Sequence, residues 1–487
     1  MNKNYLYIFI IFLFYNGLKH RKYLFFFIFK HTNKGKKILK TKKEKALLTI
    51  KNTLFSKKYK RDFTQLPNNG INSDLIKVII DERKSDINNK LSGIMYMNSK
   101  TCTKLLEYVN NKYMFSNPLH PDIYPELLKM ESEIIKMMGS LYKLPENGCG
   151  NLTTGGTEST ICALKAYKKH KKKYLPLFTP EVLCTKTVHA AVNKACELLD
   201  LKIVYVNLDE NYVMDVEDLK SKISFKTCVI IGSAPCFAYG LMDPIKKISE
   251  IAKINNIPFH VDACLGGFIT PFNKDLAFTF DLNITSISLD PHKFGYSPKG
   301  SSLLLWKNKN IRRNQYFIVS DWTGGIYASV SLPGSRVGSQ IATTWTSLLY
   351  FGHHYYKIHS NKIITATLDF KNELENMKHI DVIGNPKVNV VAFYSKLYSV
   401  SQIIEYVSKD GWNLNVLQNP MCVHICITPH NINSIKDLIN LLKNLVNEEV
   451  KEDCDNIASI YGIGAKIPDK SIIDNIVESY LDLTTNV

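Results

Sequence analysis

The fold of this chain is decided by residues 286–300, which read Ser-Ile-Ser-Leu-Asp-Pro-His-Lys-Phe-Gly-Tyr-Ser-Pro-Lys-Gly. An apolar, strand-like run over 284–289 leads into a polar His292-Lys293 pair and then into glycine and aromatic residues. A lysine at the end of a buried strand is costly unless its amine is neutralised or used covalently. Lysines in such places form Schiff bases with carbonyl compounds. The alternative is a plain surface lysine in a turn, so the rest of the chain must supply the partners of a covalent site.

From about residue 150 onward, alternating strand-like and helix-like segments predict an α/β domain with a largely parallel sheet. Four segments are expected to be strands: 227–232, 258–261, 284–289 and 302–306. The last should return antiparallel to the one before it through the glycine-rich turn, and a helix is expected over 243–252. Ligands of such sheets bind beyond the carboxyl ends of the strands. Asp262 and Lys293 both fall there.

Changes in amino-acid composition along the chain predict five segments. They are a hydrophobic anchor or targeting segment (1–30), a basic linker (31–65), an N-terminal segment (66–150), a large ligand-binding domain (151–355) and a smaller C-terminal α+β domain (356–487). Helices over 434–446 and 470–483 are expected in the last of these.

The formal net charge of +18 is concentrated at the N-terminus. Residues 1–62 hold 17 Lys and Arg against two acidic residues, so the remaining 425 residues carry a net charge of only about +3. Because no zinc-finger spacing or aromatic RNA-binding motif accompanies the charge, we expect neither a metal site nor nucleic-acid binding. The eleven cysteines form no C-x-x-C pair, which favours a reduced, cytosol-facing catalytic body.

The N-terminus contains two apolar runs, 5–15 and 23–29, each followed by basic residues. Each run is shorter than the roughly 20 residues that span a bilayer as a helix. A signal anchor, a cleaved targeting leader and an interfacial anchor are all compatible with this pattern. The flank after the first run is the more basic one, so an anchor would leave the body in the cytosol. We expect membrane anchoring.

Three stretches supply polar groups that suit a site around Lys293. Residues 153–159, Thr-Thr-Gly-Gly-Thr-Glu-Ser, open a helix whose free amides and positive dipole end suit a phosphate, although a glycine-rich turn with a helix cap explains them equally well. Asp262 ends a buried strand and needs a cationic partner, such as a pyridinium nitrogen. His189 could lie flat against a pyridine ring; alone it would be taken for a histidine at a helix N-terminus. Together they indicate pyridoxal phosphate as the cofactor.

The order of these motifs resembles the group II decarboxylase branch of the fold-type-I pyridoxal-phosphate enzymes, and within that branch the sphingosine-1-phosphate lyases. The matching stretches are 116–125, 155–159, 260–267, 286–300, 321–329 and 411–415. The resemblance extends from about residue 92 to residue 483. It implies a large, mostly parallel-sheet domain that binds pyridoxal phosphate, followed by a smaller C-terminal domain.

The resemblance also implies roles for individual residues. Lys293 would form the internal aldimine, Asp262 would keep the pyridine nitrogen protonated and His189 would stack on the ring, and these three are the expected catalytic residues. The residues implied to bind the cofactor are Lys293, Asp262, His189, His292, Thr154, Gly155, Gly156 and Thr157.

Four further positions are implied to contact the substrate. Tyr96, His120 and Lys299 match positions that grip a substrate phosphate in this family, and a phosphate calls for cationic and hydroxyl donors. Tyr239 is a candidate for proton transfer. The chain departs from the lyase pattern at Pro291, where these enzymes usually have Thr, and in the loop 334–339, which is poorer in Pro and Gly.

The implied activity is that of a pyridoxal-phosphate-dependent aldehyde-lyase of the sphinganine-1-phosphate aldolase type. It would cleave the C2–C3 bond of a phosphorylated long-chain base to a long-chain aldehyde and phosphoethanolamine. Two alternatives stay open: an amino-acid decarboxylase of the same branch, and a catalytically silent, membrane-tethered scaffold. The resemblance further implies a homodimer at the endoplasmic reticulum membrane, with targeting to another organelle by a cleaved leader as the alternative.

Overall fold

The computed structural model describes residues 65–67, 69–82, 87–97, 99–447 and 470–485, with seven single positions between 32 and 48. The hydrophobic segment predicted over 1–30 and most of the basic linker lie outside the described residues. In the part of the chain that is described, no helix is long and apolar enough to cross a membrane.

The chain forms two compact units. The larger unit comprises Asn89–Asn415 and Cys422–Lys451 and holds every residue predicted for the site. The described residues of the other unit fall within 32–88, 416–421 and 470–485. Its described helices are α4 (Ser73–Glu82) and α16 (Lys470–Thr485).

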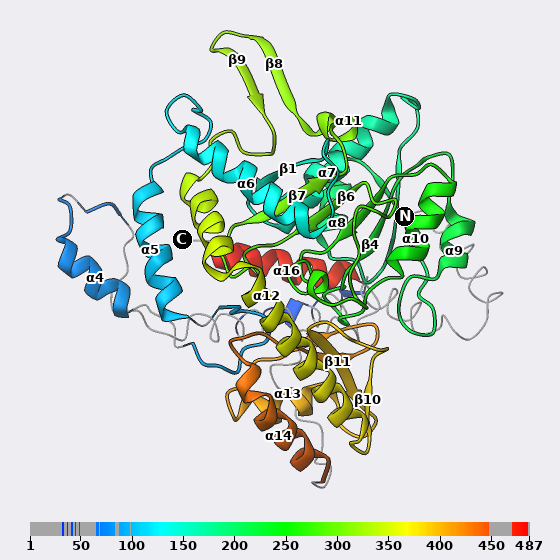
Figure 1. Cartoon of the computed structure of the whole chain (residues 1–487). Helices are drawn as coiled ribbons and strands as arrows, with labels where there is room; N and C mark the ends of the chain where they lie inside the picture. Colours follow the sequence, from blue (N-terminus) through cyan, green and yellow to red (C-terminus); the bar gives the residue numbers. More distant parts are fainter. Residues whose placement is uncertain are drawn as a thin grey trace. The chain divides into compact units, whose positions relative to one another are not determined.

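A seven-stranded sheet forms the centre of the larger unit (Figure 1). Its strands, in the order β1-β7-β6-β5-β4-β2-β3, are β1 (Cys149–Thr153), β7 (Ser302–Trp306), β6 (Ser286–Leu289), β5 (Phe259–Asp262), β4 (Thr227–Ser233), β2 (Glu181–Thr185) and β3 (Lys202–Val206). β7 runs antiparallel to both of its neighbours, and all other adjacent strands are parallel. The predicted mostly parallel sheet and the antiparallel return of 302–306 are therefore confirmed.

Both faces of this sheet are buried. Along β4, Ile230 belongs to one apolar cluster, whereas its neighbours Val229 and Ile231 belong to another. Successive side chains of a strand point to opposite faces, so two layers of helices must cover the sheet, as is typical of parallel sheets. The helices of the large-sheet region are α5 (Lys100–Tyr113), α6 (Pro125–Leu141), α7 (Gly156–Lys172), α8 (Ala191–Leu198), α9 (Val216–Lys222), α10 (Ile245–Ile254) and α11 (Lys309–Arg312), with 3₁₀ turns η2 (Thr270–Phe272) and η3 (Arg313–Gln315).

Helix α10 begins two residues later than the predicted 243–252. Asp243 does not cap the helix because its carboxylate accepts hydrogen bonds from the backbone N–H groups of Met214 (2.9 Å) and Ser233 (2.8 Å). The helix therefore starts after Pro244, whose fixed φ suits a helix entrance.

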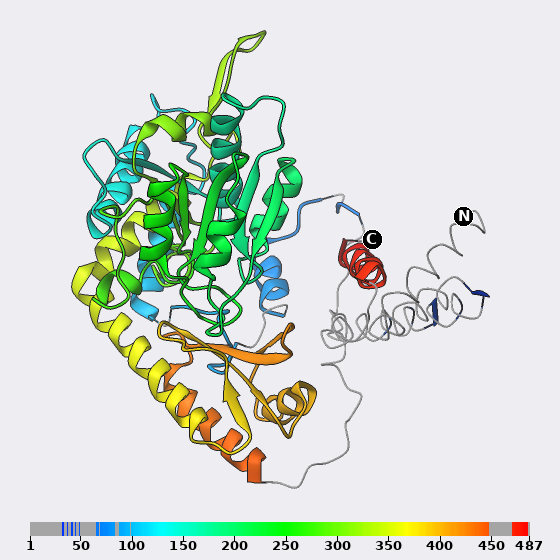
Figure 2. The ribbon, with the colours of Figure 1, turned by 90° about the vertical axis from the view of Figure 1, so that its right-hand side faces the viewer.

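A smaller sheet follows the large one, as predicted. Its strand order is β10 (Ile380–Val382), β11 (Val390–Ser395), β13 (Cys422–Cys426) and β12 (Asn415–Leu417). Two helices, α13 (Val400–Ser408) and α14 (Ile435–Asn447), and the turn η4 (Ile432–Ser434) accompany it. The long helix α12 (Gly338–Glu375) packs on α5 and α6 and continues along β10, β11 and α14, so it joins the two sheet regions (Figure 2).

A two-stranded hairpin, β8 (Phe317–Trp322) and β9 (Gly325–Ser329), projects from the larger unit (Figure 1). Its apolar side chains are exposed, with Ile318 at 65% and Ile326 at 79% of their full accessibility. An isolated hairpin of two strands is marginally stable in water.

Candidate active site

The eight residues predicted to bind the cofactor line one cavity of about 350 Å³. They reach it from three places in the fold. Thr154 to Thr157 form the entrance of α7, and His189 precedes α8. Asp262 is the last residue of β5, and His292 and Lys293 follow its parallel neighbour β6. Because β5 and β6 are in register at Asp262 and Ser288, their carboxyl ends open on the same edge of the sheet.

The entrance of α7 is shaped to receive an anion. Gly155 gives the helix no side-chain cap, so the first amides of α7 have no side-chain acceptor. A Cβ at Gly156 would lie 2.8 Å from Sγ of Cys264 and 3.0 Å from Oδ2 of Asp290, so only glycine fits there without displacing them. Exposed amides with no bulk in front of them suit a phosphate.

Glu158 was not predicted as a site residue, yet it organises this entrance. It is 5% exposed, and its Oε2 accepts hydrogen bonds from the amide (2.7 Å) and the hydroxyl (2.6 Å) of Thr154. Its other oxygen accepts from the backbone N–H of Leu332 at 3.0 Å. A hydroxyl can donate one hydrogen bond, and the Thr154 hydroxyl donates its hydrogen bond to Glu158. Of the two threonines implied to bind the cofactor, Thr157 therefore has the hydroxyl that is free to donate elsewhere.

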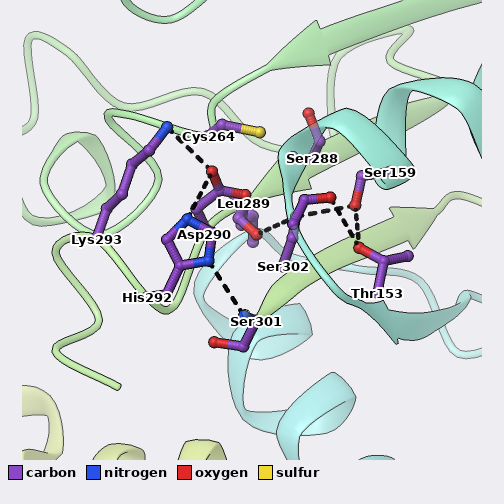
Figure 3. Close-up of polar contacts among 12 residues, drawn as sticks. Thr153, Ser159, Cys264, Ser288, Leu289, Asp290, His292, Lys293, Ser301 and Ser302 are labelled. Atoms are coloured by element: carbon purple, nitrogen blue, oxygen red, sulfur yellow. Dashed lines mark hydrogen bonds and ion pairs between the residues drawn. The ribbon is translucent and has the colours of Figure 1, made fainter. Parts of the chain in front are cut away.

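Lys293 is held by a buried carboxylate (Figure 3). Its Nζ lies 3.0 Å from Oδ2 of Asp290, which is 2% exposed. Burial, the largest single effect, lowers the pKa of Lys293, but the charge and the hydrogen bond of Asp290 and the neighbouring acidic groups together raise it above its usual range. The amine is therefore a cation in this arrangement.

His292 lies on the other side of the same carboxylate. Its Nε2 is 3.6 Å from Oδ2 of Asp290, and its Nδ1 accepts a hydrogen bond from the backbone N–H of Ser301 at 3.1 Å (Figure 3). Burial lowers the pKa of His292 despite Asp290. With Nδ1 as an acceptor, the neutral ring carries its proton on Nε2, facing Asp290.

Asp262 is ionised. Burial raises the pKa of its carboxyl. Three neighbours lower that pKa by more: the backbone N–H of Cys264, which donates to Oδ1 at 3.1 Å, and the side chains of His189 and His260. The net shift of the pKa is therefore downward. Burial lowers the pKa of His260 to about 4, and its Nδ1 lies 2.7 Å from Oγ of Ser286. An ionised carboxylate at the cavity suits a protonated ring nitrogen.

His189 is exposed to the cavity, and its orientation is fixed. Its Nδ1 accepts a hydrogen bond from the backbone N–H of Ala191 at 3.1 Å, at the entrance of α8. Its ring makes an edge-to-face contact with Phe237 at 6.3 Å between centroids. Phe237 also lines the cavity and packs edge-to-face on His424 at 4.8 Å between ring centroids.

Two of the four predicted substrate residues lie together in an adjoining cavity. Tyr96 and Lys299 line a space of about 590 Å³ that shares His292 with the first cavity. Nζ of Lys299 lies 4.5 Å from the ring centroid of Tyr96, within the range of a cation–π contact. Burial and the charge of Lys293 lower the pKa of Lys299.

The other two predicted substrate residues do not join them. His120 is exposed in the turn before α6 and lines neither cavity. Tyr239 is 3% exposed and packs edge-to-face on Tyr212 at 5.9 Å. It lines neither cavity, and burial raises its pKa to about 12.

The residues of the first cavity fit pyridoxal phosphate. The glycine entrance of α7 suits the phosphate, ionised Asp262 suits the ring nitrogen, and Lys293 supplies the amine for covalent attachment. One polar atom of the cavity, Oδ1 of Asp290, is buried without a hydrogen-bond partner among the described residues.

Comparisons with known proteins agree with this fit. Residues 82–396 match the model of the pyridoxal-dependent decarboxylase conserved domain. Sphingosine-1-phosphate lyase of Dictyostelium discoideum is 37% identical over 464 residues, covering 91% of this chain and 86% of that protein. The yeast Saccharomyces cerevisiae enzyme of the same name is 31% identical over 465 residues, covering 90% and 79%.

Solved structures give the same result. A sphingosine-1-phosphate lyase of Burkholderia pseudomallei superposes with a TM-score of 0.79 at 28% identity, covering 89% of this chain and 99% of that one. A Lactobacillus brevis glutamate decarboxylase, at 17% identity and a TM-score of 0.71, shares the fold. A pyridoxal-phosphate-dependent lyase, this chain belongs to the sphingosine-1-phosphate lyases of the pyridoxal-dependent decarboxylase family.

Proposed function

We propose that this protein cleaves the C2–C3 bond of phosphorylated long-chain bases, yielding a long-chain aldehyde and phosphoethanolamine. The observation that carries the proposal is the placement of Lys299 and Tyr96 in a cavity that adjoins the Lys293 cavity at His292. A cation beside a reactive lysine suits a substrate with a phosphate near its reacting carbon. The names of the relatives support the same substrate class.

The adjoining cavity also fits an amphiphile. Its walls include Met95, Met97 and Leu106 as well as Lys299. Flexible methionine side chains adapt to an apolar chain of variable shape, while the lysine holds the charged end. This combination favours a lipid phosphate over a small polar amino acid.

The residues of the first cavity then have separate tasks. Bound pyridoxal phosphate supplies the electron sink for breaking the carbon–carbon bond. Lys293 holds the cofactor covalently, and ionised Asp262 keeps a proton on the ring nitrogen. His189, fixed by the Ala191 N–H, provides a flat surface for the ring.

The proposal is tested by turnover with sphingosine 1-phosphate, with the aldehyde and phosphoethanolamine identified by mass spectrometry. Glutamate and aromatic amino acids are assayed in parallel, because carbon dioxide release from either would support the alternative decarboxylase activity. Lys293→Ala should abolish turnover and the absorbance of the bound cofactor. Lys299→Met should raise KM for the phosphorylated base more than it lowers kcat. A wild-type protein that binds the cofactor and leaves the phosphorylated base intact contradicts the proposal.

We further propose that the protein is a homodimer. The exposed apolar side chains of the β8–β9 hairpin, including Ile318, Trp322 and Ile326, need a covering surface. His120 lines neither cavity of its own chain, and a second copy offers a way for it to reach a substrate phosphate. Sedimentation of the full chain tests this, and replacing Ile318 and Ile326 by Ser should shift it toward the monomer.

We also propose that residues 1–30 attach the protein to the endoplasmic reticulum membrane, with the catalytic body in the cytosol. Two apolar runs with basic flanks support attachment, and a membrane-borne substrate makes it useful. Membrane fractionation of the full chain and of a variant lacking 1–30 tests this. A shortened mature N-terminus in the cell would favour a cleaved leader instead.

A further inference from the structure

Asp290 is a buried acid in direct contact with the reactive lysine. Its Oδ2 lies 3.0 Å from Nζ of Lys293 and 3.6 Å from Nε2 of His292. Its Oδ1 is buried without a hydrogen-bond partner among the described residues. Isolated buried carboxylates are costly, so Asp290 depends on the Lys293 cation.

The other titratable groups around the Lys293 amine do not share this task. They are His292, Lys299, Tyr96, Cys264 and Cys426. Burial raises the pKa of Tyr96 and of both thiols, so these three are neutral near pH 7. Burial lowers the pKa of His292, and Lys299 repels a second ammonium. Among the described residues, Asp290 is thus the acid that forms an ion pair with the Lys293 amine.

The packing around Asp290 keeps it in place. Gly156 leaves room for the carboxylate, because any larger residue would place its Cβ 3.0 Å from Oδ2 and 3.2 Å from Oδ1. Asp290 directly follows β6, whose residue Ser288 pairs with Asp262 of β5. The acid is therefore attached rigidly to the same sheet edge as the cofactor residues.

We propose that Asp290 is a positioning residue that keeps the Lys293 amine protonated and oriented whenever the amine is not bonded to the cofactor. Lys293 then serves as a proton donor. As the substrate amine replaces it, Lys293 takes one proton from the substrate ammonium and pairs with Asp290. When the C2–C3 bond breaks, the 3-hydroxyl loses its proton to water as C3 becomes the aldehyde carbon, the electron pair of the bond remains with C2, and Lys293 gives its own proton to C2. The neutral amine that results would be the form able to hold the cofactor again, while phosphoethanolamine leaves and its amine takes up a proton from water.

This inference rests on the proposed function only for the identity of the carbon that is protonated. The link between Asp290 and Lys293 is testable in the cofactor-free full chain. Lys293 is labelled with acetic anhydride across pH 6–11, and its acetylation relative to exposed lysines is read by mass spectrometry. Only the neutral amine reacts. Since an opposite charge within about 4–6 Å shifts a pKa by about 1–3 units, Asp290→Asn should raise the labelling of Lys293 at pH 8 by about 10- to 1000-fold.

Asp243→Asn is the matched control, because Asp243 is also a buried acid but hydrogen-bonds the backbone of Met214 and Ser233. It should leave the titration of Lys293 unchanged. Identical Lys293 titrations in folded Asp290→Asn and wild type would overturn the proposal. If Asp290→Asn does not fold, the wild-type curve alone decides: a Lys293 midpoint at or below that of exposed lysines overturns it, and a higher midpoint supports it. Neither readout needs substrate, so failed turnover would overturn the proposed function separately.

Discussion

Replacing Gly156 by alanine should destabilise the protein, whereas the same change at Gly155 should not. The new Cβ at Gly156 would lie 2.8 Å from Sγ of Cys264 and 3.0 Å from Oδ2 of Asp290, well inside normal contact. Neither neighbour can withdraw easily, because Asp290 pairs with Lys293 at 3.0 Å and the Cys264 amide donates to Asp262. At Gly155 the nearest protein atom would be 3.8 Å away.

The expected size follows from two opposing terms. Forcing a methyl group into a packed site costs about 1–3 kcal/mol. Alanine in place of glycine within a helix recovers about 0.5–1 kcal/mol. For Gly156→Ala the central values of these terms give a net loss of about 1 kcal/mol in the free energy of unfolding, within a range of about 0–2.5 kcal/mol. The Gly155 backbone is extended (φ 164°, ψ 167°) and accepts alanine.

Urea unfolding of the two cofactor-free variants measures this difference. The cofactor-free state is compared because a methyl group at either position also borders the space for the phosphate. Titration with pyridoxal phosphate then gives the affinity, which should fall further in Gly156→Ala because the displaced Asp290 and Cys264 both line the cavity. Equal urea midpoints for the two variants would refute the steric reasoning.

Three other changes test separate parts of the structure. Arg336→Met removes the guanidinium whose Nη2 and Nη1 donate to Oε1 and Oε2 of the buried Glu131 at 2.6 and 3.0 Å. Urea unfolding should show that the free energy of unfolding falls by about 3–5 kcal/mol, and a fall of less than about 1 kcal/mol contradicts this. Burial lowers the pKa of His424 to about 4, so the unfolded chain binds a proton at this residue more tightly than the folded chain does. The contribution of His424 to the free energy of unfolding is complete above about pH 6.5 and should fall by on the order of 3 kcal/mol toward pH 4. In thermal melts, His424→Gln should flatten this dependence on pH, and the same change at the exposed His354 should not. Glu158→Gln weakens an acceptor of three hydrogen bonds and should cost about 1–3 kcal/mol and weaken cofactor binding; unchanged unfolding and cofactor titrations count against it.

Strands of the sheet could be predicted where an apolar run is followed by an acidic or basic residue of the kind found in active sites. The runs ending at Asp262 and Leu289 are short, apolar and followed by glycine-rich turns, so both their type and their shared edge follow from the pattern. The hairpin β8–β9 was not predicted, because its exposed apolar residues have no alternation that separates a buried from a solvent face.

The site was predictable where a residue type alone indicates its chemistry, and not where packing gives the residue its role. Asp290 precedes a Pro-His-Lys turn and would pass for an ordinary turn acid; its burial depends on Gly156, distant in sequence. Similarly, the turn 234–240 has no regular side-chain alternation, so the sequence pointed to Tyr239 as a substrate residue, whereas it is Phe237 that lines the cavity.

Gly352 divides the long helix α12. Its φ of 62° and ψ of 171° are not helical, so the helical periodicity of the first half does not continue into the second half. Before it, buried residues face all directions; after it they recur every three or four residues, at Tyr356, Ser360, Ile363 and Thr367. One inserted residue in a continuous helix rotates everything beyond it by about 100°. At Gly352 the irregular backbone can absorb that rotation, so α12 should tolerate a change of length there and at few other points.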